Sequence, residues 1–201
     1  MSSDAEVRKL ARVLGVSPER FDYLHDVPPE DLRLLRASVT SVLYDAHLDV
    51  LERMAGASRL LPVPLLARMA ERVFGPVLSA RIAGLVEVGR GVDIASRLSP
   101  AFLSDVAAEL DPRRAAGIIA GLPVPVAVDV AAELSRRRDW ITIARFVDIL
   151  PERTITACLE VIPDKALPLV ARMVDDPARV HYVTDLLPQH RLDAIADDLA
   201  G

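Results

Sequence analysis

The chain is poor in cysteine, in aromatic residues and in lysine, and each shortage narrows what it can be. Its one cysteine, Cys158, leaves no partner for an internal disulfide and no thiolate cluster for a metal. Aromatic residues make up 4% of the 201 residues, so Leu, Val, Ile and Ala must fill the interior. The setting Thr156-Ala157-Cys158-Leu159 is typical of a core-facing helix. We therefore interpret Cys158 as a small buried residue rather than a nucleophile.

Positive charge is scarce and is carried almost entirely by arginine. The net charge is −5, and the only lysines are Lys9 and Lys165. A nucleic-acid-binding protein normally presents a basic face, so we expect no nucleic-acid partner. We interpret the arginine bias as the mark of a GC-rich, bacterial genome.

No stretch of the sequence predicts a targeting signal or a membrane span. The first six residues are polar and acidic, whereas a secretory signal opens with positive charge followed by an apolar run. The longest weakly charged stretch, residues 115–128, contains Gly121, Pro123 and Pro125 and is too short and too interrupted to cross a bilayer. We expect a cytoplasmic protein.

Proline punctuates the second half of the chain at intervals of about a dozen residues or a multiple of that. Proline is tolerated in the first turn of a helix, where the amide has no intrahelical acceptor, so each one marks a helix start. The prolines concerned are Pro100, Pro112, Pro123, Pro151, Pro163, Pro177 and Pro188.

These prolines divide the chain after residue 98 into eight short helical segments. They span residues 99–110, 111–122, 123–138, 139–150, 151–162, 163–176, 177–187 and 188–199. Taken in pairs they repeat at about 25 residues, and the string Asp-Val-Ala-Ala-Glu-Leu at 105–110 returns at 129–134. Because such short helices are marginal alone, each pair must bury its apolar face against its neighbours.

The first 56 residues differ from the rest, and a shorter rhythm of helices begins at Pro62. We expect a helix over 4–14, a helix start at Ser17-Pro18, and one long helix from Pro28 to about Ala55 with a single apolar stripe. Further helices are predicted over 64–73, 77–88 and 92–98, with breaks at 74–76 and at Gly89-Arg90-Gly91. The predicted domains are an N-terminal helical cap, 1–61, and a helical-repeat domain, 62–201.

The repeat resembles the intracellular N-terminal domain of the MgtE family of magnesium transporters. The matching residues are Leu98-Ser99-Pro100 with 107–110, Asp111-Pro112 with Ala115-Ala116, Leu122-Pro123 and Leu150-Pro151. This resemblance covers about 62–199 and implies a right-handed superhelix of short helices, similar also to the armadillo-type units of the flagellar switch protein FliG. Family transporters continue into paired CBS domains and membrane helices that are not found here, so we expect no transport activity and assign no metal site.

We interpret two polar clusters as structural rather than catalytic or metal-binding. Phe21-Asp22-Tyr23-Leu24-His25-Asp26 combines a histidine with carboxylates, but Phe21 and Leu24 share the spacing of a packing helix face. Residues 44–49 also combine a histidine with carboxylates but lack the His-x-x-x-His or Glu-x-x-His spacing of a helical metal site. We predict a solvated polar face there.

A basic cluster next to the only tryptophan is the candidate partner-binding site. Arg136, Arg137, Arg138 and Trp140 combine positive charge with an aromatic anchor, although arginines at a helix end also suit the helix dipole. No phosphate loop, nucleotide fingerprint or nucleophile elbow accompanies them.

The sequence therefore predicts an all-α right-handed superhelix, or solenoid, of short helix pairs with an N-terminal helical cap. We expect a non-catalytic binding or scaffold module with a protein partner and no cofactor. Two alternatives stay open: a carrier for an apolar, lipid-like small molecule, and a sensor of divalent cations that uses acidic residues such as Asp175 and Asp176. Self-association also stays open.

Overall fold

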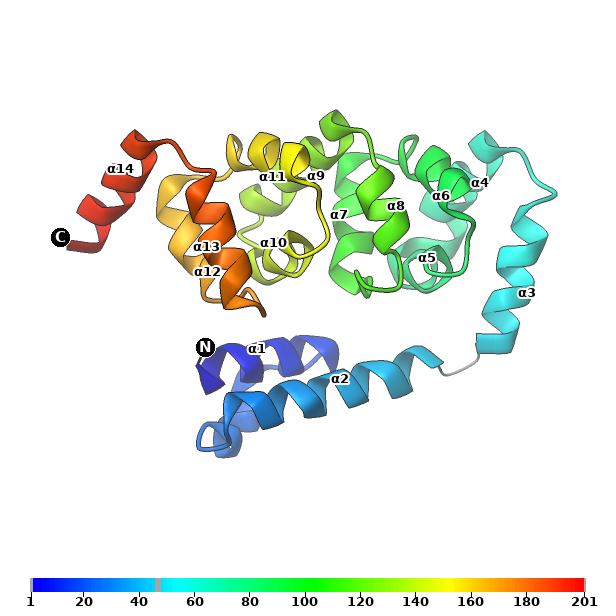
Figure 1. Cartoon of the computed structure of the whole chain (residues 1–201). Helices are drawn as coiled ribbons and strands as arrows, with labels where there is room; N and C mark the ends of the chain where they lie inside the picture. Colours follow the sequence, from blue (N-terminus) through cyan, green and yellow to red (C-terminus); the bar gives the residue numbers. More distant parts are fainter. Residues whose placement is uncertain (1, 46–47, 201) are drawn as a thin grey trace. The chain divides into compact units, whose positions relative to one another are not determined.

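The computed structural model describes residues 2–45 and 48–200, and those residues form helices, turns and loops without a β-strand. The all-α prediction is confirmed. The chain divides into two compact units, Met1–Leu48 and Asp49–Gly201. Figure 1 follows the chain from the N-terminal helices in blue to the C-terminal helix in red.

The N-terminal unit contains two α-helices and a 3₁₀ helix. They are α1 (Ser3–Val13), η1 (Pro18–Leu24) and α2 (Pro29–Asp45), and α1 packs on both of the others. The predictions of a helix over 4–14 and of a helix start at Ser17-Pro18 are confirmed. Leu10 and Leu32 are almost fully buried and join α1 to α2 in a small core.

This small core also encloses an ionic cluster. Glu6 is fully buried, and its Oε1 accepts a hydrogen bond from Lys9 Nζ at 2.9 Å while its Oε2 accepts one from Arg36 Nε at 3.0 Å. A buried carboxylate is costly unless charged donors surround it, so the three side chains depend on one another. Lys9, one of the two lysines in the chain, thus serves as a partner of a buried carboxylate.

The helix predicted from Pro28 to about Ala55 is helical over α2, which ends at Asp45, and over α3 (Leu48–Ser58). Residues 46 and 47, between these two helices, lie outside the described residues. The predicted apolar stripe is buried only at its start: Leu32 is 1% exposed, whereas Val42 is 73% exposed. α2 has 17 residues and its partner α1 has 11, so α1 is too short to cover the last turns of α2.

The second unit is a succession of short helices. They are α4 (Val63–Met69), the π-helical turn η2 (Ala70–Phe74), α5 (Gly75–Ala83), α6 (Val88–Ala95), α7 (Pro100–Glu109), α8 (Ala116–Gly121), α9 (Val124–Arg136), α10 (Trp140–Val147), α11 (Glu152–Leu159), η3 (Asp164–Ala166), α12 (Leu167–Ala171), α13 (Pro177–Asp185) and α14 (Gln189–Ala200). Each of the eight segments predicted after residue 98 contains one α-helix.

Side-chain caps fix several of the helix starts. Ser99 Oγ accepts a hydrogen bond from the amide of Phe102 at 3.4 Å, and Asp139 Oδ1 accepts one from Thr142 at 3.2 Å. Such caps satisfy amides that have no intrahelical acceptor. These helices therefore begin at the cap residues that the sequence pattern indicates.

The predicted break at Gly89-Arg90-Gly91 is wrong, because these residues open α6. Glu87 caps the helix by accepting hydrogen bonds from the amides of Gly89 and Arg90 at 2.9 and 3.0 Å. Gly91 serves close packing: a Cβ there would lie 2.2 Å from Ile118 Cδ1, on α8. Gly117 plays the same part in α8, where a Cβ would lie 2.8 Å from Val88 Cγ2. The glycines let α6 and α8 approach closely rather than ending a helix.

Most helices of this unit pack on the helix two positions further along. The packed pairs include α4 with α6, α5 with α7, α6 with α8, α7 with α9, α9 with α11, and α10 with α12. These contacts join α4, α6 and α8 into one row of helices and α5, α7, α9 and α11 into another, and Figure 1 shows the helices from α4 to α13 following one another along the unit. Clusters of buried apolar side chains lie among these helices.

Arginine side chains connect successive parts of the unit through backbone carbonyls. Arg179 of α13 donates from Nε to the carbonyl of Val147 and from Nη2 to that of Leu150, both at 3.0 Å. Arg191 of α14 donates to the carbonyls of Leu159 and Ile162, both at 2.8 Å.

The same bonds occur earlier in the chain. Arg90 donates to the carbonyls of Ser58 and Leu61, and Arg145 donates to those of Ala108 and Leu110. For Arg90, Arg179 and Arg191 the two carbonyls lie 32 and 29 residues earlier in the chain. Three of these four arginines therefore make the pair of contacts at the same separation in sequence, while the carbonyls that Arg145 reaches lie 37 and 35 residues earlier.

The arginine contacts coincide with prolines at three places. Leu61, Leu150 and Ile162 each precede a proline, which has no amide hydrogen, and the carbonyl of each accepts a hydrogen bond from an arginine. The N–H donors of a guanidinium lie in one plane at fixed angles, so a single arginine can donate to two carbonyls at once. A lysine ammonium carries its donors on one rotatable nitrogen and has no such fixed geometry. The arginine bias therefore has a structural use beyond genome composition.

We predict that Arg179→Lys destabilises the protein although it preserves the charge. The variant keeps at most part of the paired contact and leaves a helix-terminal carbonyl short of a donor, at a cost of about 1–3 kcal/mol. Urea denaturation followed by circular dichroism measures the loss. Arg172→Lys, at an exposed position, is the control and should change the midpoint little. Equal midpoints for both variants would contradict the role given to Arg179.

Candidate ligand cavity

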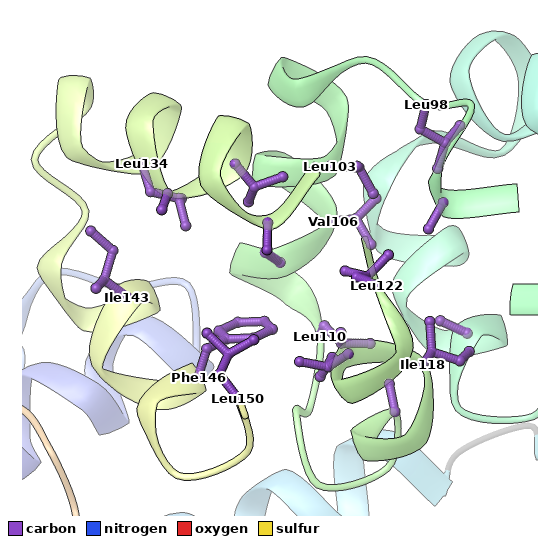
Figure 2. A pocket seen from close by; sticks show the side chains of 18 of the residues that line it. Leu98, Leu103, Val106, Leu110, Ile118, Leu122, Leu134, Ile143, Phe146 and Leu150 are labelled. Carbon is purple, nitrogen blue, oxygen red and sulfur yellow. The ribbon is translucent and has the colours of Figure 1, made fainter. Parts of the chain in front are cut away.

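An apolar cavity of about 440 Å³ runs through the unit that begins at Asp49. Its wall draws on residues from Met54 in α3 to Leu187 after α13, so almost every helix of the unit contributes. Figure 2 shows part of this wall, where Leu103 and Val106 of α7, Leu134 of α9 and Phe146 of α10 surround a common interior space. The cavity is a feature of the whole succession of helices and not of one pair.

The wall is aliphatic and carries no charged side chain. Leucine, isoleucine, valine, alanine and methionine provide nearly all of it, with Phe74 and Phe146 as its aromatic members. The polar side chains in the wall are Ser58, Ser79 and Thr184, with the thiol of Cys158 beside them. Such a surface favours hydrocarbon over water.

Small side chains explain why the helices do not close on one another. Ala107 of α7 and Ala127 and Ala131 of α9 are buried at the cavity wall, where a leucine or phenylalanine would fill space. The low aromatic content has the same effect, because aromatic rings are the largest fillers of a helical core. The composition thus predicts an interior made of aliphatic groups, but only the packing shows that a cavity of this size persists.

The hydroxyl of Ser79 is the unusual polar atom of the wall. Ser58 donates to the carbonyl of Ala55 at 2.6 Å and Thr184 to that of Val180 at 2.9 Å. Ser79 Oγ is buried and has no hydrogen-bond partner among the described residues. A buried polar atom left without a partner costs free energy, so the position of this hydroxyl in the wall needs an explanation.

Cys158 lies in the same wall, buried as predicted. Burial away from water raises the pKa of its thiol to about 11, because the charged thiolate is poorly solvated there. At neutral pH the group is therefore a protonated thiol, which is a weak nucleophile. In this environment Cys158 contributes to the cavity as an apolar side chain.

The predicted partner-binding residues lie elsewhere and are held within the chain. Arg136 donates to Glu133 at 2.8 and 2.7 Å, and Arg137 donates to Glu133 at 2.7 Å and also to Asp105. Arg138 follows α9 with a positive φ of 58°. The side chain of Trp140 packs against the buried cluster around Leu134, Ile143, Ala144, Ile162, Ala166, Val170 and Val174.

Hydrogen bonds from Arg136 and Arg137 lower the pKa of Glu133 to about 2, from an ordinary 4.5. A depressed carboxyl pKa contributes stability that is present above pH 4.5 and is lost as the pH falls through 2. The group at the end of α9 is thus arranged as a stabilising ionic cap.

We predict that Glu133→Gln is less stable than the parent at pH 7 and that the difference shrinks as the pH falls from 4.5 toward 2. Urea midpoints measured at a series of pH values give both results. A constant difference between the two proteins across this range would show that the carboxylate is not the stabilising species.

The remaining polar clusters hold no metal-like arrangement. His25 Nε2 lies 3.6 Å from Asp22 Oδ1 at the exposed end of η1, and Phe21 and Leu24 are half-buried. The cluster predicted at 44–49 includes residues 46 and 47, which lie outside the described residues. Where the structure describes side chains, no three His, Cys, Asp or Glu residues gather closely enough to hold a metal ion.

Comparison with known protein families, with curated proteins and with solved structures finds no match to this chain. The described helices include none with both the length and the apolar character needed to cross a membrane. The cavity is therefore the feature from which function has to be inferred.

Sequence analysis singled out none of the residues that define this cavity as a site. Alanines and leucines at helical spacing are indistinguishable from an ordinary core until the helices are placed. The signals that pointed toward it were general ones: high aliphatic content, few aromatic residues and positive mean hydropathy.

Proposed function

We propose that this protein binds a single-chain, lipid-like molecule in the cavity of its larger unit. The observation that carries the proposal is one continuous aliphatic cavity of about 440 Å³, within the range of ligand sites in proteins. This is the small-molecule alternative of the sequence analysis, in which the binding module acts on a lipid rather than on a protein.

The energetics of the cavity favour an apolar occupant. Water entering such a space needs two to four polar partners, and the wall provides almost none. A ligand that binds the folded protein and not the unfolded chain therefore stabilises the fold as it binds.

The distribution of the wall favours a long, thin ligand. The lining extends from α3 to α13, so a ligand that follows it contacts almost every helix of the unit in turn. A flexible hydrocarbon chain fits such a space, whereas a helix with its side chains is about 10–12 Å wide. This contrast is the reason to place a lipid rather than a partner helix inside.

Ser79 supports a ligand with a polar group at one end. Its unpartnered hydroxyl can donate to a carboxylate or ester oxygen near α5, while the hydrocarbon extends along the remaining wall. Burying ten methylene groups gives about 8 kcal/mol before the costs of immobilising the ligand. The corresponding affinity is micromolar or weaker for the shorter chains and stronger for the longer ones.

The same proposal includes the superhelical arrangement. Packing between helices two positions apart and arginine contacts at constant spacing support a solenoid of helix pairs, as the resemblance to the MgtE N-terminal domain implies. In that interpretation the cavity lies between the two rows of helices, where a closed core would lie in a protein with larger side chains.

Ala131→Phe should block the cavity. Ala131 is 8% exposed and lines the wall, so a phenyl ring there would occupy the space of the hydrocarbon. We expect a fluorescent fatty acid to bind the parent protein and to bind Ala131→Phe at least tenfold more weakly. Titration of the probe, with unlabelled palmitate as competitor, measures both.

Ala101→Phe is the matched control, because Ala101 is an exposed residue of α7 outside the wall. This variant should bind the probe like the parent. Circular dichroism verifies that both variants remain helical. Failure of the parent to bind any acyl probe, or equal binding by both variants, would overturn the proposal.

A second test concerns the polar end of the ligand. Ser79→Ala removes one hydrogen bond and should weaken palmitate about three- to tenfold, while leaving an acyl chain without a polar end unaffected. Competition titrations with palmitate and with hexadecane against the same probe measure the two effects. An equal change for both ligands would show that Ser79 acts only through the packing of the wall.

A further inference from the structure

We infer that the end of the larger unit formed by α4, η2 and α5 docks on an anionic phospholipid membrane. The inference rests on the proposed function, since a protein that binds a lipid must exchange it with a membrane or another carrier. The docking residues are Leu60, Leu65, Arg68, Arg72, Val73 and Val77, which together are named the basic apolar surface.

The apolar part of this surface is unusually exposed. Leu60 is 86% exposed and Val73 is 71% exposed, and Leu65 and Val77 are also largely in contact with solvent. Isolated exposed apolar residues are ordinary, but here they follow one another within a short segment of the chain. Side chains of this type enter the boundary between head groups and acyl chains when a protein lies on a bilayer.

Helix geometry places apolar and basic residues side by side. Leu65, Arg68 and Arg72 are separated by three and four residues, so they share one face of the run from α4 into η2. The opposite face carries the buried Leu66, Ala67 and Ala70. A π turn takes more residues than an α turn, so η2 brings Val73 toward the face of Leu65.

The charge of this segment is opposite to that of the rest of the chain. Residues 59–81 contain four arginines and one glutamate, a net charge of +3, in a chain whose net charge is −5. The other residues therefore carry −8 in total. Arg68 and Arg72 are exposed, and neither has an ion pair with a carboxylate among the described residues. This local reversal is complementary to anionic lipid head groups.

The surface and part of the cavity wall belong to the same elements. Leu66, Met69, Ala70 and Phe74 line the cavity from the same two elements, α4 and η2, that carry Arg68 and Arg72 outside. Ser79 lies on α5, the next element. An acidic protein would be complementary to the arginines alone, whereas a membrane is complementary to arginines, exposed aliphatic residues and an adjoining lipid cavity together.

The test is sedimentation with vesicles. The parent protein should bind vesicles made of equal parts phosphatidylcholine and phosphatidylglycerol, bind pure phosphatidylcholine vesicles far more weakly, and lose affinity at high salt. An arginine near an anionic surface is worth about a fivefold change in affinity. Arg68→Glu/Arg72→Glu should therefore weaken binding to the mixed vesicles by well over tenfold.

Two further variants control for net charge and for the apolar contact. Arg153→Glu/Arg172→Glu reverses the same charge at exposed positions on other elements and should bind like the parent. Leu60→Ser/Val73→Ser keeps every charge and should weaken binding to the mixed vesicles several-fold. Equal loss in both double charge reversals, or no preference of the parent for the anionic vesicles, would overturn the inference.

The outcome is separable from that of the proposed function. Arg68→Glu/Arg72→Glu should still bind the fluorescent fatty acid in solution, and Ala131→Phe, with its cavity blocked, should still bind the mixed vesicles. Binding of the parent to polyglutamate but not to vesicles would assign the surface to an acidic protein partner and overturn the membrane assignment. Loss of fatty-acid binding with retained vesicle binding would leave the docking surface intact and refute the cavity.

Discussion

The guanidinium–carbonyl contact between successive parts of the chain is the interaction on which the larger unit depends. Leu61, Leu150 and Ile162 are each followed by a proline, which has no amide hydrogen, and their carbonyls accept hydrogen bonds from Arg90, Arg179 and Arg191. These arginines come from elements that lie much later in the sequence, and Arg145 donates in the same way to the carbonyls of Ala108 and Leu110. The same hydrogen bonds thus satisfy carbonyls at helix ends and join segments that are distant in sequence.

These contacts at helix ends help to explain how the helices can be held around a cavity. In an ordinary core the interior side chains both exclude water and fix the positions of the helices. Here polar contacts at helix ends act together with buried apolar clusters, and the cavity wall carries small residues such as Ala107 and Ala131. The glycine contact between α6 and α8 adds a close approach at one place, and the wall elsewhere stays open enough for a hydrocarbon chain.

Local sequence signals predicted the helices well where caps and prolines decide the boundaries. From Ser99 onward the helix boundaries are set by residues within one turn of each boundary, so the sequence predicts them directly. Gly89-Arg90-Gly91 was misread as a break, since the close approach of Ile118 that requires Gly91 involves a residue distant in sequence. The apolar stripe of α2 is exposed at Val42 for a related reason: apolar periodicity does not show how far a partner helix extends.

The candidate site was the least predictable part. Charged and aromatic residues attract attention in a sequence, and Arg136, Arg137 and Trp140 were singled out for that reason. In the structure the two arginines are occupied by Glu133 and the indole packs on a buried cluster. The cavity depends instead on small side chains at many positions of its wall. A small side chain in a sequence does not reveal a cavity until the positions of the surrounding helices are known.

Native mass spectrometry of the protein purified without detergent tests the central claim most directly. The claim is that the interior of the larger unit holds an apolar ligand. The account predicts a population heavier than the polypeptide by the mass of a single-chain lipid, which organic extraction removes and which Ala131→Phe does not retain. A spectrum showing only the bare polypeptide, from cells in which the protein is natively expressed, would contradict it.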